Sequence, residues 1–173
     1  MNKKIVSGIT IILLISVVVV FQGIHDSVSA LNRDALIGSW KLVSVTMFGD
    51  NGERINNPFG VNPTGILIYT PEGRMAALLS NDGRKPFSVA DWLTAPLEEK
   101  AGAITSFMAY SGRYTVTGDK VIHKVEVASV QNWVNTELIR SVKLEGDKLT
   151  LTAPPTLVNG KNRTFTLVWE RTK

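Results

Sequence analysis

The chain has 173 residues, of which 44% are apolar, and it contains no cysteine. A disulfide scaffold and a cysteine-ligated zinc or iron–sulfur site are therefore excluded. Lysine and arginine outnumber aspartate and glutamate by 19 to 15, but the basic residues are scattered and form no stripe, which argues against nucleic acid as a partner.

The first 30 residues are typical of a secretory signal peptide. Lys3 and Lys4 precede an apolar run over residues 5–21, and Val28 and Ala30 stand at the third and first positions before a cleavage site. We therefore expect cleavage after Ala30 and a secreted or periplasmic product with no membrane contact. The alternative is an uncleaved anchor, because the run reaches the lower limit of about 17 residues for a membrane-spanning helix.

Residues 31–173 are expected to form a single domain of short, alternating apolar segments separated by turn residues. The predicted strands are 40–48, 64–70, 74–80, 112–117, 121–130, 137–144, 148–153 and 163–171. Eight consecutive strands joined mostly by short turns close most simply into an up-and-down antiparallel barrel, which leaves no exposed strand edge. The predicted fold is therefore an all-β barrel.

Residues 88–110 interrupt the strand pattern. Leu97, Ala101, Ile104 and Met108 are spaced for one face of a helix. We expect a helical insert between the third and fourth predicted strands. It could cover a barrel mouth as a lid, but we favour a plug that merely covers apolar surface.

Alternate side chains of a strand point to the same side, so the pattern also predicts inward faces. The predicted inward residues are Trp40, Leu42, Ser44, Thr46 and Phe48; Tyr110, Gly112, Tyr114 and Val116; Val121, His123, Val125 and Val127; Leu138, Arg140, Val142 and Leu144; and Phe165, Leu167 and Trp169. The predicted interior is apolar and aromatic, with one imidazole and one guanidinium.

An inward Arg140 needs a partner, because burial of an unpaired charge is unfavourable by several kcal/mol. No acidic residue falls on the predicted inward faces, so a ligand anion or trapped water is the natural partner. Alternatively, Arg140 lies near a strand end, stacks on an aromatic ring and reaches solvent. For His123 the choice lies between a neutral core histidine and an acid–base group.

Several segments resemble a known family. The stretch Gly38-Ser39-Trp40 together with Arg171 resembles the lipocalin arrangement, in which a tryptophan at the closed end packs against a late arginine. The order of segments 58–65, 67–75, 109–114, 121–127, 132–137 and 167–171 is similar to that of the bacterial and fungal lipocalin-like domain family. The resemblance implies a barrel with a candidate pocket, but most of this family has no settled activity.

Two positions depart from the family pattern. Asn135 stands where a glycine is usual, and Gln131 stands where a proline is usual. The resemblance therefore does not predict the conformation of the loop between the fifth and sixth strands.

The leading functional hypothesis is a carrier of a small hydrophobic ligand. The expected ligand-binding residues are Arg140, Tyr110, Tyr114 and Trp133, the expected structural residues are Trp40 and Arg171, and the candidate catalytic residue is His123. No metal or cofactor is expected, because His123 is the single histidine of the mature chain and no inward acids accompany it. The alternatives are a cofactor-independent isomerase, cyclase or dehydratase that uses His123, and a barrel filled by its own side chains.

Overall fold

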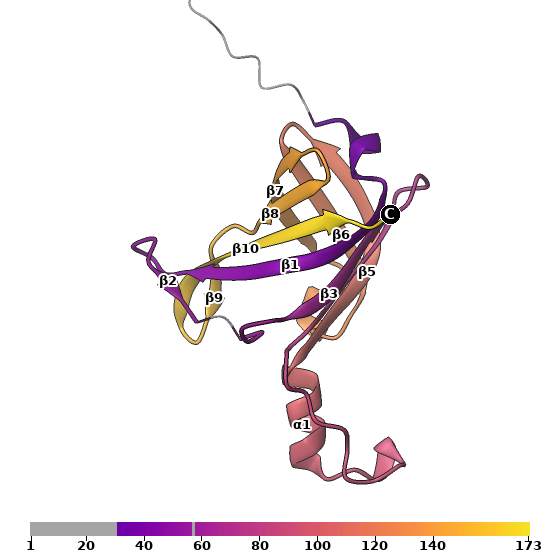
Figure 1. Cartoon of the computed structure of the whole chain (residues 1–173), viewed down its shortest axis with the longest axis vertical. Helices are drawn as coiled ribbons and strands as arrows, with labels where there is room; N and C mark the ends of the chain where they lie inside the picture. The colour runs from indigo at the N-terminus through magenta and orange to yellow at the C-terminus, as the bar shows by residue number, and fades with distance from the viewer. Residues whose placement is uncertain (1–30, 57) are drawn as a thin grey trace, which may run out of the picture.

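Eight antiparallel strands follow one another around a barrel, and the last strand pairs with the first, as the computed structural model shows (Figure 1). The structure describes residues 31–56 and 58–173, so the predicted signal peptide lies outside the described residues. The barrel strands are β1 (Gly38–Phe48), β3 (Thr64–Tyr69), β4 (Arg74–Ser80), β5 (Phe107–Thr117), β6 (Lys120–Ala128), β7 (Glu137–Glu145), β8 (Lys148–Thr152) and β10 (Lys161–Arg171). The predicted barrel is confirmed.

Two short strands were not predicted. β2 (Arg54–Ile55) pairs with the end of β1, and β9 (Thr156–Val158) pairs with the start of β10, to which the Asn159-Gly160 turn connects it. Three 3-10 turns complete the described elements, namely η1 (Arg33–Leu36), η2 (Trp92–Thr94) and η3 (Gln131–Trp133). No helix within the described residues is long and apolar enough to cross a membrane.

The insert differs from its prediction in extent and in packing. Its helix, α1 (Leu97–Thr105), lies where it was expected along the chain, but it falls between β4 and β5 because β2 adds one to the strand count. The helix is much shorter than 88–110, since β5 already begins at Phe107. The expectation that the helix covers apolar surface is wrong: α1 has no buried residue and projects from one end of the barrel (Figure 1).

Two β-bulges alter the predicted inward faces. In β1 a bulge between Leu42 and Ser44 shifts the alternation, so Val45 and Met47 are buried instead of Ser44, Thr46 and Phe48. In β6 the register shifts opposite Ser111 and Gly112, and Val127 consequently turns outward and is 65% exposed. An extra residue in one strand exchanges the two faces beyond it, and no alternation pattern reveals this.

Gly112 allows the second bulge. A Cβ at this position would lie 2.0 Å from the Lys124 backbone oxygen, a separation that no side chain tolerates. The glycine therefore lets β5 and β6 approach closely where the register changes.

One end of the barrel is closed by η1 and by a tryptophan–arginine stack. The Arg171 guanidinium lies 4.0 Å from the centre of the Trp40 ring, and its two terminal nitrogens donate hydrogen bonds of 2.7 Å to the carbonyl oxygens of Ile37 and Ala35. Trp40 Nε1 donates to the Leu36 carbonyl oxygen at 2.9 Å, and Leu36 is fully buried. These contacts hold the N-terminal turn across the barrel floor.

Candidate functional site

The barrel encloses a cavity of about 370 Å³. Its lining comes mainly from inward residues of the strands, together with Pro58, Phe59, Val130 and β9 at the rim. The described residues that line it are Pro58, Phe59, Leu67, Ala77, Leu79, Met108, Tyr110, Val130, Trp133, Arg140, Leu151, Ala153, Thr156, Leu157, Val158, Phe165, Leu167 and Trp169. The centre is therefore hollow and largely apolar, as a small-molecule site requires.

Arg140 is the one charged side chain among the described residues of this lining. It reaches the cavity from β7 because the alternation of that strand turns Leu138, Arg140, Val142 and Leu144 to the inner side. The side chain is half-buried, and its Nη1 donates a hydrogen bond of 2.8 Å to the Ile139 carbonyl oxygen. None of the ion pairs formed within the described residues includes Arg140, so its charge has no anionic partner there.

Behind the cavity wall lies a buried cluster formed by Tyr69, Tyr110 and His123. Tyr69 Oη is 2.7 Å from His123 Nε2, and Tyr110 Oη is 3.0 Å from His123 Nδ1. The three residues come from β3, β5 and β6, and His123 is fully buried. Tyr110 contacts both the histidine and the cavity, whereas His123 and Tyr69 are not among the described lining residues.

The electrostatics of this cluster keep it uncharged at neutral pH. Burial and the nearby Arg140 guanidinium lower the pKa of His123 from 6.5 to about 3. Burial likewise raises the pKa of Tyr69 well above its ordinary value. Burial also raises the pKa of Tyr110, against the opposing effect of Arg140.

Satisfaction of the buried donors favours one direction for these hydrogen bonds. Tyr69 is 1% exposed, and its hydroxyl has no acceptor among the described residues other than His123 Nε2. If Tyr69 donates to Nε2, the ring proton sits on Nδ1 and is donated to Tyr110 Oη. The hydroxyl proton of Tyr110 is then free to point into the cavity. The opposite direction would leave the Tyr69 proton buried without a partner, which costs about 1–3 kcal/mol.

Trp169 carries a buried donor in the cavity wall. It is 1% exposed and lines the cavity from β10, yet its Nε1–H has no hydrogen-bond partner among the described residues. Trp133 also lines the cavity, and its ring meets the Tyr110 ring edge to face at 5.8 Å. Arg140 and Tyr110 therefore offer polar groups to the cavity, and aromatic and aliphatic side chains form most of its wall.

The structure does not bring Tyr114 to this cavity. Its hydroxyl donates to the Thr70 carbonyl oxygen at 3.0 Å, and Arg33 lies over its ring at 5.2 Å, toward the closed end. The rim strand Thr156–Val158, in contrast, was missed as a source of lining residues. Its β-branched residues beside the Asn159-Gly160 turn are a hairpin signal that could have identified it.

The loop after β6 accommodates both departures from the family pattern. Asn135 adopts a φ of 62°, a left-handed conformation that asparagine tolerates better than most residues. Gln131 begins η3, which carries Trp133 to the cavity rim. The loop therefore keeps the geometry that a glycine at position 135 would provide.

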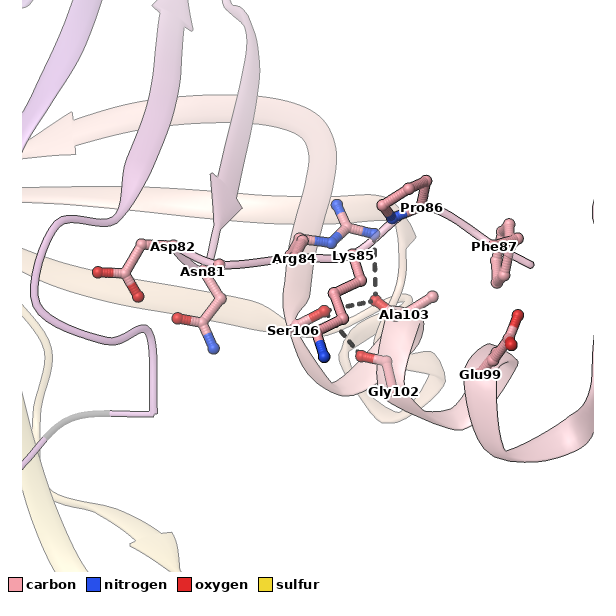
Figure 2. Close-up of a pocket in the computed structure, with 11 residues that line it drawn as sticks. Asn81, Asp82, Arg84, Lys85, Pro86, Phe87, Glu99, Gly102, Ala103 and Ser106 are labelled. Carbon is pink, nitrogen blue, oxygen red and sulfur yellow. Dashed lines mark hydrogen bonds between the residues drawn. The ribbon is translucent and has the colours of Figure 1, made fainter.

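A second hollow lies at the base of the insert, between residues 81–87 and α1 (Figure 2). Its polar groups already hold the insert together: Arg84 donates to the Ala103 carbonyl oxygen, and Glu99 accepts from the Ser88 backbone nitrogen. Asp82 accepts two backbone hydrogen bonds, from Val61 and Asn62. Within the described residues there is no group of three or more potential metal ligands. The barrel cavity is therefore the stronger candidate site.

An eight-stranded barrel with one closed end and an internal apolar cavity defines a lipocalin-type protein. The sequence model of the lipocalin-like domain family matches residues 37–172, and the chain belongs to this family.

Two known proteins are similar to this chain. The 4'-hydroxy-3'-methoxypropiophenone carrier protein ppsC of Aspergillus oryzae is 33% identical over 106 residues, which cover 56% of this chain and 96% of that protein. A lipocalin-like protein from Bacteroides uniformis, known from a crystal structure, matches 80% of this chain and 99% of its own with a TM-score of 0.42 and 13% identity. The family and the carrier relative point to small-molecule binding.

Proposed function

We propose that this protein binds and carries a small, largely apolar ligand in the barrel cavity. The observation that carries the proposal is the cavity itself, about 370 Å³ of space lined by apolar and aromatic side chains with Arg140 as its one charged group among the described residues. Burial of apolar ligand surface supplies affinity at about 25 cal/mol per Å². The few polar groups would orient the ligand.

For the ligand class we propose an aromatic ketone or a related phenol. The relative ppsC is named as a carrier of 4'-hydroxy-3'-methoxypropiophenone, and the cavity of this chain combines aromatic rings with hydrogen-bond donors. Trp133, Phe165 and Trp169 offer surfaces for an aromatic ring. Arg140 and Tyr110 offer donors to its oxygen atoms.

Isothermal titration calorimetry with 4'-hydroxy-3'-methoxypropiophenone, hereafter the probe, tests this proposal. We expect saturable one-to-one binding to residues 31–173. Ala77→Phe fills the cavity and should abolish the heat of binding, because Ala77 lines it. Ala76→Phe is the matched control, since Ala76 lies on the outer side of the same strand. Equal binding by both variants would place the ligand outside the barrel.

The hydrogen-bonded cluster favours a second candidate, proton transfer to a bound carbonyl compound, as an isomerase, cyclase or dehydratase would need. Tyr110 would touch the substrate, and His123 would act through it. The carrier is the better-supported function, because the described lining residues include no carboxylate or imidazole to accept a substrate proton. Exchange of the probe's α-hydrogens in D₂O, followed by NMR, tests the alternative: protein-dependent exchange that Tyr110→Phe removes would favour an enzyme.

We further propose that the protein is exported after cleavage at Ala30, because residues 1–30 carry the charge and hydropathy pattern of a signal peptide. Intact mass spectrometry of the protein released from expressing cells tests this. A mature chain beginning at Leu31 is expected, and a full-length chain retained in membranes would contradict the proposal.

A further inference from the structure

We propose that the cavity binds its ligand through an ionised oxygen, as a phenolate or carboxylate, held by Arg140 and Tyr110. This inference rests on the proposed function and names the chemical form of the ligand that the site selects. It is carried by the charge of the cavity lining and by the direction of the buried hydrogen bonds.

The lining places a positive charge beside an apolar hollow without a compensating anion. Arg140 is the one charged group among the described lining residues, and it forms no ion pair with any described acidic side chain. The titratable side chains that interact electrostatically with Arg140 are Tyr69 on β3, Tyr110 on β5 and His123 on β6. All three are uncharged at neutral pH, so the field at this part of the cavity is positive.

The hydrogen-bond direction adds a second preference for an anion. In the favoured tautomer Tyr69 donates to His123 Nε2 and His123 Nδ1 donates to Tyr110, which leaves the Tyr110 hydroxyl proton for an acceptor in the cavity. Hydrogen bonds from polarised donors to an ionised acceptor are shorter and stronger than bonds between neutral groups. A neutral phenol oxygen can also accept from these groups, but it forms weaker hydrogen bonds than an ionised oxygen does.

A buried indole donor lies within the cavity wall. Trp169 Nε1–H is buried, unpartnered within the described residues, and belongs to a side chain that lines the cavity. Trp169 lies on β10, whereas Arg140 lies on β7. Since this donor has almost no accessible surface, Arg140 and Tyr110 carry the recognition of the ligand, and the site suits an aromatic compound with an acidic oxygen.

Absorption spectroscopy of the bound probe tests the inference, because para-acyl phenols absorb at longer wavelength as phenolates than as phenols. The protein should be titrated into the probe at a pH below the pKa of the free phenol. We expect the phenolate band to appear on binding and the apparent pKa of the probe to fall by at least about one unit, equivalent to a tenfold preference for the ionised form.

Two variants and one ligand analogue test which groups stabilise the ionised form of the probe. Arg140→Met should weaken binding of the probe by about tenfold and, measured at saturating probe, should remove the phenolate band and the pKa shift, and Tyr110→Phe should reduce the shift. The 4'-O-methyl ether of the probe cannot ionise and should bind at least about tenfold more weakly than the probe near neutral pH.

Each outcome has a distinct meaning. Binding of the probe to the wild-type protein with an unchanged neutral spectrum overturns this inference and leaves the carrier proposal standing. A shift that persists in Arg140→Met also overturns it. Absence of any binding of the probe and of its ether refutes the proposed function, and this inference with it.

Discussion

His123 shows how the barrel uses a titratable side chain as a neutral structural group. Both ring nitrogens are hydrogen bonded to tyrosine hydroxyls, and the residue is fully buried. Its pKa of about 3 means that the folded protein keeps the ring neutral over most of the acidic range. The hypothesis that His123 acts directly as an acid or base remains a prediction, but Tyr110 stands between it and the cavity.

We expect the free energy of unfolding to fall as the pH drops from about 6.5 toward 3. The unfolded chain binds a proton on His123 below about 6.5, whereas the folded chain does not until about 3. The limiting slope from this residue is about 1.4 kcal/mol per pH unit. Urea unfolding of residues 31–173 at several pH values measures it.

His123→Gln is the comparison for this prediction, because glutamine does not titrate. The variant is expected to be less stable at pH 7 but to show a smaller loss of stability between pH 6.5 and 4.5. Carboxylates contribute equally to both proteins, so their effect cancels. Identical slopes in the two proteins would show that burial does not depress the pKa of His123.

Gly38 illustrates how one residue supports the closed end. Its φ is 131°, and a Cβ there would lie 2.9 Å from Arg171 Nη1. Gly38→Ala should therefore destabilise the protein by about 1–3 kcal/mol, through backbone strain and displacement of Arg171.

Gly52→Ala provides the control, since Gly52 also has a positive φ, 78°, but a Cβ there would meet nothing within 4 Å. Thermal unfolding measured by circular dichroism compares the two variants. A greater loss in Gly38→Ala is expected from its more extreme φ and the Arg171 contact together; equal losses would contradict a destabilising displacement of Arg171.

At the scale of elements, the insert between β4 and β5, residues 81–106, projects from the barrel and is not part of its core; it is called the arm below. Leu97 and Ile104 of α1 are 83% and 53% exposed, and Trp92 is 62% exposed. The arm starts and ends at neighbouring positions, because Asn81 N donates to the Ser106 carbonyl oxygen at 2.9 Å. Its removal should leave the barrel ladder between β4 and β5 intact.

We expect that replacement of residues 84–104 by a short Gly-Ser linker changes the free energy of unfolding by less than about 1 kcal/mol, since α1 buries no residue and the small side chain of Ala95 is the one buried apolar group in this described segment. Asp82 is retained because it holds the backbone of Val61 and Asn62. Circular dichroism and the probe titration measure the result. Failure to fold would show that the arm stabilises the barrel, and faster release of the probe would show that it acts as a lid.

At the scale of the whole molecule, closure of the sheet joins all the barrel strands into one hydrogen-bonded ring around the cavity. β1 pairs with β10 along its length and with β3 at its start, so the ring of strands is complete. We therefore expect a single cooperative unfolding transition. The probe at 100 times its Kd should stabilise the fold by about 2.7 kcal/mol.

Differential scanning calorimetry with and without the probe checks this expectation, with Ala77→Phe as the variant that should gain no stability. Two separate transitions would contradict a single cooperative barrel. A rise in the melting temperature that Ala77→Phe retains would contradict binding inside the cavity.

The sequence by itself determined the barrel and much of its inner surface. Alternation and turn residues are local properties, so they predicted the eight barrel strands and the inward faces of β5, β7 and β10. They also placed His123 and Arg140 on inner faces. Tyr110, Trp133 and Arg140 were named as candidate ligand-binding residues, and the structure places all three at the cavity.

Only the tertiary structure decided how the inner residues divide between core and cavity. Two bulges reversed the faces of β1 and β6 beyond them, and bulges depend on pairing between strands. The alternation pattern places both His123 and Arg140 on inner faces. In the closed barrel, however, Tyr69 and Tyr110 cover the histidine, whereas the arginine lines the cavity. Contacts between residues far apart in the chain, and the space left between them, follow from the packing of the whole barrel.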